Sequence, residues 1–499
     1  MTRIGVLAAC LSFAGCAGPG PRLFPVAPLA ERALQNGGAL RLYDVNGDGR
    51  ADFGEQLSRE GLVESLHYDT DADGGGGTIV HLAEIASDQR RDLVLILDSI
   101  PYRMVHDLWQ AGRFRYCRPP TRVISPFPVM TDVSLAEFFG VSPCPGLESR
   151  YYDGSRLTSG YWKYAGDVDM PWVPRVDYRM WTIAHTRAYL DPHPWFDHEL
   201  RVIQDRMTQR VQQAANGDAA AQRAFIGYCV GPSSLGANEG RNGHQAGLIR
   251  VDRVCQQMLY DTRGRVRVSM FSDHGHNLVR SRRIPLADLL SRFGYRVSTR
   301  LERPGDIVVP EFGIVTYAAI HTQQPAGVAR DVVGIDGVTL AAWLDEQDRV
   351  VVRSRDGLAA ITKSGDAYCY RCEYGDPLGL LPLLDELRKH GAGDAAGCAA
   401  DETWFTVTAD HIYPDPLHRL WRAFHGLVVH QPDVLVCSAE GYHFGSALMD
   451  RMVALAAAHG SLSAVSSTGF AMTAAGDLPR VVQMENLRDA LLELGVGVE

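Results

Sequence analysis

The stretch Phe271-Ser272-Asp273-His274-Gly275-His276 follows a strand-like run, Val266–Phe271. Its carboxyl and imidazole groups therefore stand where a half-buried strand would end. Adjacent Asp and His side chains at such a position can offer one oxygen and one nitrogen ligand to the same divalent metal, and this ligand set suits zinc. The pair alone decides little, because Asp-His also occurs at residues 197–198 and 410–411.

Short apolar runs alternate with longer helical patterns from Asp92 onward. The predicted strands are Leu93–Leu97, Phe225–Val230 and Val434–Cys437, and the predicted amphipathic helices are Leu286–Phe293 and Leu448–Ala458. Continuous apolar strands interleaved with helices indicate an α/β domain whose sheet is buried on both faces. Functional sites in such domains gather at the carboxyl ends of the strands, where both Asp98 and the Asp273-His274 pair stand.

The composition limits the class of protein. The chain has 499 residues, of which 46% are hydrophobic, so it is long enough for one large domain with appendages. Its formal net charge of −10 argues against nucleic-acid binding, which normally requires a basic face. After the N-terminus, no run approaches the length of apolar sequence that spans a membrane.

The N-terminus predicts export. Met1-Thr2-Arg3 followed by the apolar run Ile4–Ala14 is typical of a bacterial secretion signal over residues 1–16. Phe13-Ala14-Gly15-Cys16 is similar to a lipoprotein cleavage box, in which Cys16 becomes the lipidated first residue. We therefore expect a protein of the periplasm or cell envelope, attached to the membrane through a lipid anchor only. Residues 17–38 are rich in Pro, Gly and Ala and are predicted to be a linker.

An Asp-rich module is expected over residues 39–85. Residues 44–55 have the spacing of an EF-hand calcium loop, although their flanks are not clearly helical; the predicted ligands are Asp44, Asn46, Asp48, Arg50 (backbone), Asp52 and Glu55. A second, incomplete copy offers Asp69, Asp71 and Asp73. Paired Asp-rich turns between strands also resemble the calcium loops of extracellular β-repeat modules, and acidic turns without metal remain an alternative.

The cysteines are compatible with an oxidising compartment. Without Cys10 and Cys16, eight remain, and an even number permits disulfides. Cys369-Tyr370-Arg371-Cys372 has the spacing of a zinc knuckle, but no second pair matches it. We interpret it as a local disulfide or as free thiols.

Four short motifs occur in a characteristic order. They are Leu95-Ile96-Leu97-Asp98, Phe127-Pro128-Val129-Met130-Thr131, Ser272-Asp273-His274-Gly275 and His459-Gly460. This order, over roughly residues 90–475, resembles the alkaline phosphatase superfamily and within it the type I phosphodiesterases and nucleotide pyrophosphatases. The resemblance implies an α/β domain over residues 90–499, with a mixed, mostly parallel sheet flanked by helices. Residues 295–400 would form a cap, an insertion or more of the sheet.

The resemblance also implies a chemistry. Members of the superfamily hold two metal ions, usually zinc, and hydrolyse phosphoesters. Carried over, Asp98, Asp273 and His274 would bind one ion, with Thr131 as a further ligand and the nucleophile. His459 corresponds to a late histidine ligand of the second ion. The expected partner is a small organic phosphoester, and the expected cofactors are one or two divalent ions, with calcium at the N-terminal loops.

The second metal site departs from the family pattern. Val230 and Ser234 align where the family has an Asp and a His, and neither replaces them well as a ligand. Three explanations remain open. The site is lost; or it is rebuilt from Glu239 and His244; or the alignment is wrong and the ligands come from another set, namely Asp177, His185, Asp197 or His198.

Two functions follow. The first is an exported metal-dependent phosphoester hydrolase with Thr131 as nucleophile; Ser99 is a weaker rival, because the neighbouring ligand would crowd it. The second is a catalytically impaired, calcium-binding envelope protein that uses the pocket for binding. A sulfatase is disfavoured, because Cys117-Arg118-Pro119-Pro120-Thr121-Arg122 lacks the Ser and Arg of the sulfatase signature.

Overall fold

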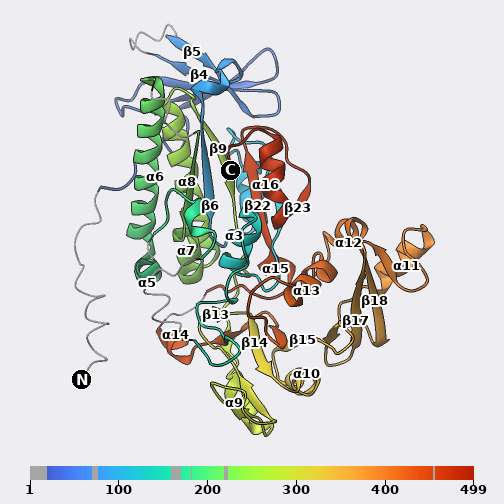
Figure 1. Cartoon of the computed structure of the whole chain (residues 1–499). Coiled ribbons are helices and arrows are strands. Elements are labelled where there is room, and N and C mark those ends of the chain that lie inside the picture. The colour runs from blue at the N-terminus through green and yellow to red at the C-terminus, as the bar shows by residue number, and fades with distance from the viewer. Residues whose placement is uncertain are drawn as a thin grey trace, which may run out of the picture.

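The computed structural model describes residues 19–69, 77–158, 170–180, 182–217, 223–452 and 456–498 (Figure 1). Three larger sheets organise this part of the chain. We name them the N-terminal sheet (β1 to β5), the central sheet (β6 to β9, β22 and β23) and the distal sheet (β11, β12, β14 to β20). The predicted signal peptide and Cys16 lie outside the described residues.

The N-terminal sheet is an antiparallel meander. Its strands are β1 (Ala30–Ala33), β2 (Ala39–Tyr43), β3 (Phe53–Leu57), β4 (Val63–Tyr68) and β5 (Thr78–His81). Phe24 is fully buried in its core, with its ring 4.8 Å from that of Tyr43 and 5.6 Å from that of Phe53. The stretch 17–38, which was expected to be a linker, therefore supplies both an edge strand and a core residue. The Phe24 ring packs on the apolar core of the N-terminal sheet, although small residues surround it in the sequence.

The central sheet is mixed and mostly parallel, as predicted. Its order is β23 (Val481–Gln483), β7 (Thr121–Ile124), β22 (Thr468–Thr473), β9 (Val266–Phe271), β6 (Arg91–Leu97) and β8 (Ala224–Cys229). The pairings of β22 with β7 and β9 are antiparallel, and those of β6 with β8 and β9 and of β23 with β7 are parallel. All strands except β22 therefore run in one direction.

Helices cover both faces of the central sheet (Figure 1). One face packs against α2 (Tyr102–Gln110), α6 (Pro192–Ala215) and α8 (Arg241–Asp261), and the other against α3 (Thr131–Phe139) and α16 (Met484–Glu493). Strand β6 explains this arrangement, because Leu93, Leu95 and Leu97 point to the first face while Val94 and Ile96 point to the second. Helix α7 (Gly231–Glu239) begins at the carboxyl end of β8, and α5 (Thr182–Leu190) packs against α6 and α7.

The distal sheet lies beyond the carboxyl ends of the central strands (Figure 1). Its order is β11 (Arg296–Val297), β12 (Asp306–Val308), β14 (Tyr317–Thr322), β20 (Val434–Ser438), β15 (Val338–Leu344), β16 (Val350–Arg353), β17 (Leu358–Ser364), β18 (Ala367–Tyr374) and β19 (Cys398–Ala400). Because β20 pairs with both β14 and β15, residues 295–400 are not a separable insertion. They share one sheet with a strand from much later in the chain.

Helices and a small sheet complete this half of the molecule. They are α9 (Leu286–Arg292), α10 (Pro325–Val332), α11 (Leu381–Lys389), α12 (Asp401–Thr408), α13 (Pro416–Phe424), α14 (Ala447–Met452) and α15 (Ala464–Ser467), with β10 (Arg282–Arg283), β21 (Tyr442–Gly445) and β13 (Ile314–Val315). The helix predicted over Leu448–Ala458 does not reach its expected end: α14 is described as far as Met452, residues 453–455 lie outside the described residues, and residues 456–458 are not helical. No helix in the described ranges is long and apolar enough to cross a membrane.

The disulfide differs from the local one that the sequence suggested. Cys369 in β18 pairs with Cys398 in β19, and Cys372 is a free thiol. Side chains alternate across a strand, so residues three apart in β18 point to opposite faces and cannot bridge each other.

We predict that Phe24→Ala destabilises the N-terminal sheet. Removing a fully buried Phe leaves a cavity and costs about 3–5 kcal/mol of unfolding free energy. Limited proteolysis should then cut within residues 19–69 at lower urea concentration than in the wild type. Val26→Ala is the control, because the Val26 side chain is 55% exposed and should change little. Equal protection of both variants would contradict the packing of Phe24.

Candidate metal centre

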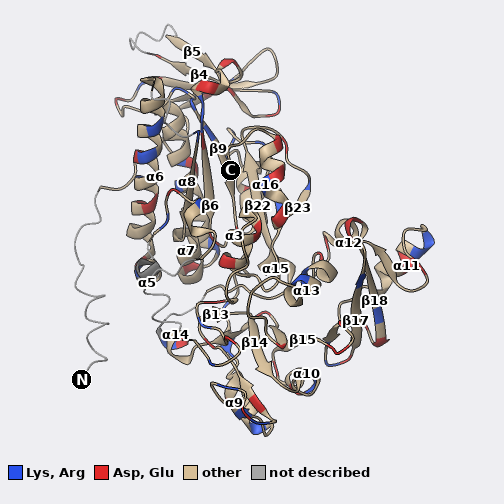
Figure 2. Ribbon diagram, viewed as in Figure 1, with Lys and Arg blue, Asp and Glu red and all other residues tan. Residues whose placement is uncertain are grey.

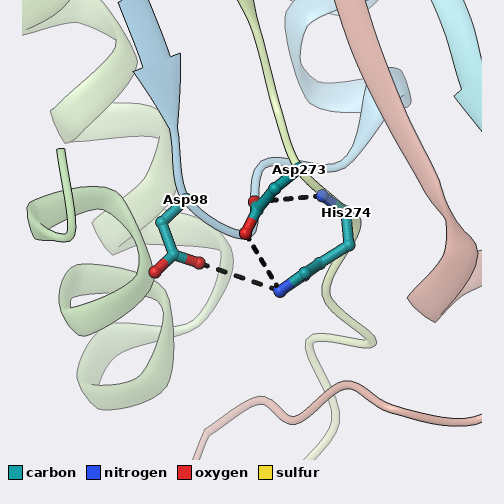
Figure 3. Close-up of side chains that lie close together, drawn as sticks. All are labelled: Asp98, Asp273 and His274. Carbon is teal, nitrogen blue, oxygen red and sulfur yellow. Dashed lines mark hydrogen bonds and ion pairs between the residues drawn. The ribbon is translucent and has the colours of Figure 1, made fainter. Parts of the chain in front are cut away.

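Two parallel strands bring three predicted ligands together. Asp98 follows β6, and Asp273 and His274 follow β9, which is hydrogen-bonded to β6 with Ile96 opposite Phe271. One ligand atom from each of the three residues lies within 4.8 Å of the others, and all three residues are buried (Figure 3). In the described part of the chain, no other group of at least three His, Cys, Asp or Glu residues converges in this way.

The hydrogen bonds leave lone pairs pointing into the cluster. Asp273 Oδ1 accepts from the backbone N–H groups of Ser99 and His274, both at 3.0 Å. Asp273 Oδ2 is buried without a hydrogen-bond partner and lies 3.4 Å from His274 Nε2. His274 Nδ1 lies 2.9 Å from the Gly275 carbonyl oxygen, so Nδ1 carries the proton and donates it. The Nε2 lone pair of His274 therefore faces the two carboxylates.

The electrostatics of the cluster favour a bound cation. Burial raises the pKa of Asp273 well above its usual value, and the nearby Asp98 carboxylate raises it further. Burial lowers the pKa of His274, so this imidazole is neutral and does not balance the acids. Two buried carboxylates, one of them with an unpartnered oxygen, together with an imidazole lone pair fit a divalent metal. This donor set of two oxygens and one nitrogen suits zinc.

Thr131 stands at the edge of the same cluster. It is the first residue of α3, and its Oγ1 lies 3.4 Å from His274 Nε2. Its nearby hydroxyl also partly offsets the rise in the pKa of the Asp273 carboxyl. Thr131 is only partly buried, whereas the ligands are enclosed. The first N–H groups of a helix have no partner within the helix and favour anions, so an anion beside Thr131 would meet a favourable field.

His459 lies beside the cluster without joining it. Its ring stacks on that of His274, with centroids 4.0 Å apart, and its Nδ1 lies 2.9 Å from the Val129 carbonyl oxygen. Burial lowers the pKa of His459 to about 3, so the ring is neutral. His276, which was not predicted as a site residue, lies next to His459, and its Nδ1 is 3.1 Å from Nε2 of the buried His244. The signal in the sequence was the second histidine of the stretch 271–276.

Val230 and Ser234 do not face the cluster. The Val230 side chain is buried among apolar residues, and its N–H and that of Gly231 donate to the buried carboxylate of Glu199. Ser234 Oγ donates to the Gly231 carbonyl oxygen at 2.8 Å. Burial raises the pKa of Glu199 to about 8. An acid does lie near the end of β8, but it caps α7 rather than offering a ligand to the cluster.

Hydroxyl groups surround Asp98 instead. The Tyr228 phenol donates to Asp98 Oδ2 at 2.6 Å, and Ser99 Oγ donates to Asp98 Oδ1 at 2.7 Å. Ser99 Oγ also contacts Ser233 Oγ at 3.1 Å, and Ser233 in turn contacts the Tyr189 hydroxyl at 2.8 Å. The Ser99 hydroxyl is thus engaged within a buried network, which disfavours it as the rival nucleophile.

The other residues considered for a second metal site have partners elsewhere in the described structure. Glu239 pairs with His193, Asp177 with Arg210, Asp197 with Arg250 and His198 with Arg201, while His185 Nε2 lies 3.2 Å from the Met180 carbonyl oxygen. The structure brings none of them into the cluster with Asp98.

The Asp-rich loop connects two strands, β2 and β3, so the helix–loop–helix form of an EF-hand is not what this loop adopts. Its carboxylate oxygens accept from the loop's own backbone: Asp44 from Gly47, Asp48 and Gly49, Asp52 from Val45 and Asn46, and Asp48 from Arg50. Glu55 lies buried in β3 and accepts from the Tyr43 hydroxyl at 3.1 Å. Of the second copy, only Asp69 is described; Asp71 and Asp73 lie outside the described residues.

Comparisons with known proteins find likeness only among solved structures. No protein-family model and no curated protein matches the chain. Murine ectonucleotide pyrophosphatase/phosphodiesterase 5, as an inactive variant in complex with AMP, aligns with a TM-score of 0.42 and 11% identity over 82% of this chain and 96% of that one. A second structure of the same murine protein gives a TM-score of 0.38 with the same identity and coverage. By name, both are nucleotide pyrophosphatases/phosphodiesterases, the branch that the motifs resemble.

We predict that the metal-free protein loses stability as pH rises, partly through Asp273. A carboxyl whose pKa is raised on folding holds its proton longer in the folded state, so its stabilisation is full below the unfolded pKa and is lost as pH rises toward the folded value. In a chelator, the wild type should therefore lose more unfolding free energy between pH 5 and pH 8 than Asp273→Asn, as measured by urea denaturation.

Asp489→Asn is the control for this measurement, because Asp489 is exposed on α16. It should follow the wild type. If Asp273→Asn and the wild type showed the same pH dependence in chelator, Asp273 would not have the raised pKa that burial and Asp98 are expected to cause.

Proposed function

We propose that this protein is a metal-dependent phosphoester hydrolase in which Thr131 is the nucleophile. One observation carries the proposal: the buried Asp98, Asp273 and His274 converge at one point, and the Thr131 hydroxyl lies within reach of two of them. A structural role alone does not explain why two carboxylates are buried side by side without a cation to balance them.

The reaction is a displacement in two steps. Thr131 Oγ1 attacks phosphorus while the bond to the leaving oxygen breaks; the threonine proton passes to water and the leaving oxygen takes up a proton. Water then cleaves the new Thr131–phosphorus bond, which restores the hydroxyl and releases the phosphate product. A bound divalent cation would lower the pKa of the attacking hydroxyl and offset charge on the phosphoryl oxygens.

This chain's own residues do the positioning. Gly275 fixes the His274 tautomer, because its carbonyl oxygen accepts from Nδ1, and the Ser99 and His274 N–H groups fix the orientation of Asp273. Tyr228 holds the Asp98 carboxylate in the same way. His459 stacks on His274 and restrains its ring. The ligands are thus oriented before a cation or substrate arrives.

The proposed cofactor is zinc, with one or two ions bound, and the proposed substrate is a small organic phosphoester. Export with lipidation at Cys16 is also proposed; the Cys369–Cys398 disulfide supports an oxidising compartment. We also propose that residues 44–55 bind calcium. The turn between β2 and β3 would then act like a calcium loop of a β-repeat module.

A second candidate function is a binding protein that has lost catalysis. It is favoured by the positions of Val230 and Ser234, which offer no side-chain ligand to a second ion. In that case the cluster would still hold metal, but no phosphoester would turn over.

Thr131→Ala separates the two functions. For a hydrolase, the purified wild type turns over p-nitrophenyl phosphate or bis-p-nitrophenyl phosphate, and the variant loses at least about a thousandfold in kcat, as expected for removal of a nucleophile. Bound zinc, measured by mass spectrometry, should persist in the variant, because Asp98, Asp273 and His274 remain. Thr131→Ser should retain part of the activity.

Thr362→Ala is the matched control, because Thr362 is a partly buried threonine on β17 in the distal sheet. It should keep both activity and zinc. A zinc-loaded wild type without activity on any ester would reject the hydrolase and leave the binding protein.

A further inference from the structure

A cleft of about 710 Å³ lies at the end of the central sheet opposite to the metal cluster. Its walls come from the turn and edge of the N-terminal sheet, residues 58–64 and 81–84, and from the beginnings of β6 and β9 at Arg90 and residues 266–268. The loop 115–118 closes one side. The backbone N–H of Val63 donates to the Arg115 carbonyl oxygen, which joins this loop to β4. The cleft is therefore built jointly by two parts of the chain.

The charged side chains of the cleft are sorted by depth. Those that are partly buried are all arginines: Arg90, Arg115, Arg118 and Arg267. The acids that line the cleft, Glu60, Glu64 and Glu84, are exposed at its rim. Figure 2 shows Lys and Arg colouring where β6 and β9 begin beneath the N-terminal sheet. The inner wall is thus positive in a chain whose formal net charge is −10.

Two of these arginines have acidic partners. Arg267 makes a two-pronged contact with Asp92, at 2.6 and 3.0 Å, and Arg118 lies 3.4 Å from Glu60. Their charges are therefore already opposed by carboxylates.

Arg90 and Arg115 have no carboxylate partner within the described residues. Arg90 donates to the Leu82 carbonyl oxygen, and its buried Nε has no hydrogen-bond partner. Arg115 lies over the Trp109 ring, with its guanidinium carbon 4.0 Å from the ring centroid. Burial lowers the pKa of both arginines, and the neighbouring Arg267 and Arg41 lower the pKa of Arg90 and Arg115 respectively. A bound anion would therefore stabilise the positive charges of both guanidinium groups.

The remaining wall is apolar. Leucine and valine side chains from both parts of the chain contribute to it: Leu62, Val63, Leu82, Leu259, Val266 and Val268. The cleft thus combines an apolar part with many charged groups, and its volume is in the range of small-molecule sites. Guanidinium groups are suited to carboxylate or phosphate, because their donors match the two oxygens of an anion.

We propose that this cleft binds a small organic anion, with Arg90 and Arg115 holding its phosphate or carboxylate group and the leucine and valine wall receiving its apolar body. This site is separate from the metal cluster and does not depend on the hydrolase proposal. A ligand there would contact the N-terminal sheet and the central sheet at once, so its binding would hold the two together.

Calorimetry with phenylphosphonate tests the site, because its phosphorus–carbon bond resists hydrolysis. Benzoate, titrated separately, distinguishes a carboxylate from a phosphate preference, and benzyl alcohol serves as the neutral probe. All titrations use the full chain carrying Thr131→Ala, loaded with zinc and then also treated with chelator, so that binding at the metal cluster can be recognised by its loss with the metal. We expect saturable binding of at least one anion in chelator, and none of the alcohol.

Arg90→Gln and Arg115→Gln should each weaken that binding at least about tenfold, the loss expected for one charge-assisted hydrogen bond. Arg292→Gln is the matched control, because Arg292 is an exposed arginine in the last turn of α9, far from the cleft in the chain and not part of its walls, and should change affinity little. Thermal unfolding without ligand checks that each variant folds. If either variant failed to fold, hydrogen exchange of the parent chain decides: phenylphosphonate or benzoate should protect residues 58–64 and 81–90.

The absence of saturable anion binding in chelator would overturn the proposal. Equal weakening in all three arginine variants would do so too, because it would indicate attraction to the general surface charge. Protection confined to residues around Thr131 would place the anion at the metal cluster instead.

Discussion

Two carboxylates buried side by side are the constraint on which the centre of this structure depends. The parallel pairing of β6 and β9 places Asp98 and Asp273 at adjoining strand ends, where neither can reach bulk water. Burying a charge costs several kcal/mol unless partners compensate for it. The chain compensates with N–H and hydroxyl donors from Ser99, His274 and Tyr228. The backbone of Ser99 has a φ of 63°, a left-handed conformation that is unfavourable for a residue with a side chain, and its N–H points at Asp273. The remaining unpartnered oxygen of Asp273 is what a cation would satisfy.

The carboxylates in the Asp-rich loop of the N-terminal sheet are compensated in a different way. They are at the surface, and their oxygens accept from backbone N–H groups within the same turn, as at Asp44 and Asp52. Short acidic side chains commonly stabilise turns in this way. The same residue type thus has different consequences at the two places. In the loop the backbone supplies donors to the carboxylates, whereas at the ends of β6 and β9 one oxygen of Asp273 is left without a donor.

Much of the fold could be predicted because its signals are local. Leu93–Leu97 and Val266–Phe271 are continuous or nearly continuous apolar runs, and each is a strand that ends at a predicted ligand. The convergence of Asp98, Asp273 and His274 followed from strand ends meeting at one edge of a sheet. The order of motifs added Thr131, whose Oγ1 lies 3.4 Å from His274 Nε2.

The features that could not be predicted depend on distant contacts. Phe24 lies in a stretch of Pro, Gly and Ala, and only the fold shows that its ring fills the N-terminal sheet. The disulfide partner of Cys369 is Cys398, whereas the sequence pointed to the nearby Cys372. Tyr228 looked like one more apolar residue of a strand, yet its hydroxyl holds Asp98. Periodicity can place a side chain on a face but does not reveal what lies opposite.

The charge of the cluster bears on which phosphoester it would accept. Asp98 and Asp273 contribute −2 when ionised, neutral His274 contributes nothing, and one divalent cation contributes +2, so the loaded cluster sums to zero. Burial raises the pKa of the adjacent Asp132, while Trp172 and Arg179 oppose that rise, so Arg179 has a carboxylate of its own to balance. A dianionic monoester would then bring two charges to a site with no net positive charge, whereas a diester brings one. The oxygens of Asp98 accept from the neutral hydroxyls of Tyr228 and Ser99, which add no charge to the site. With a single bound cation, the proposed hydrolase would therefore favour diesters over monoesters, and the helix N-terminus at Thr131 would supply further attraction.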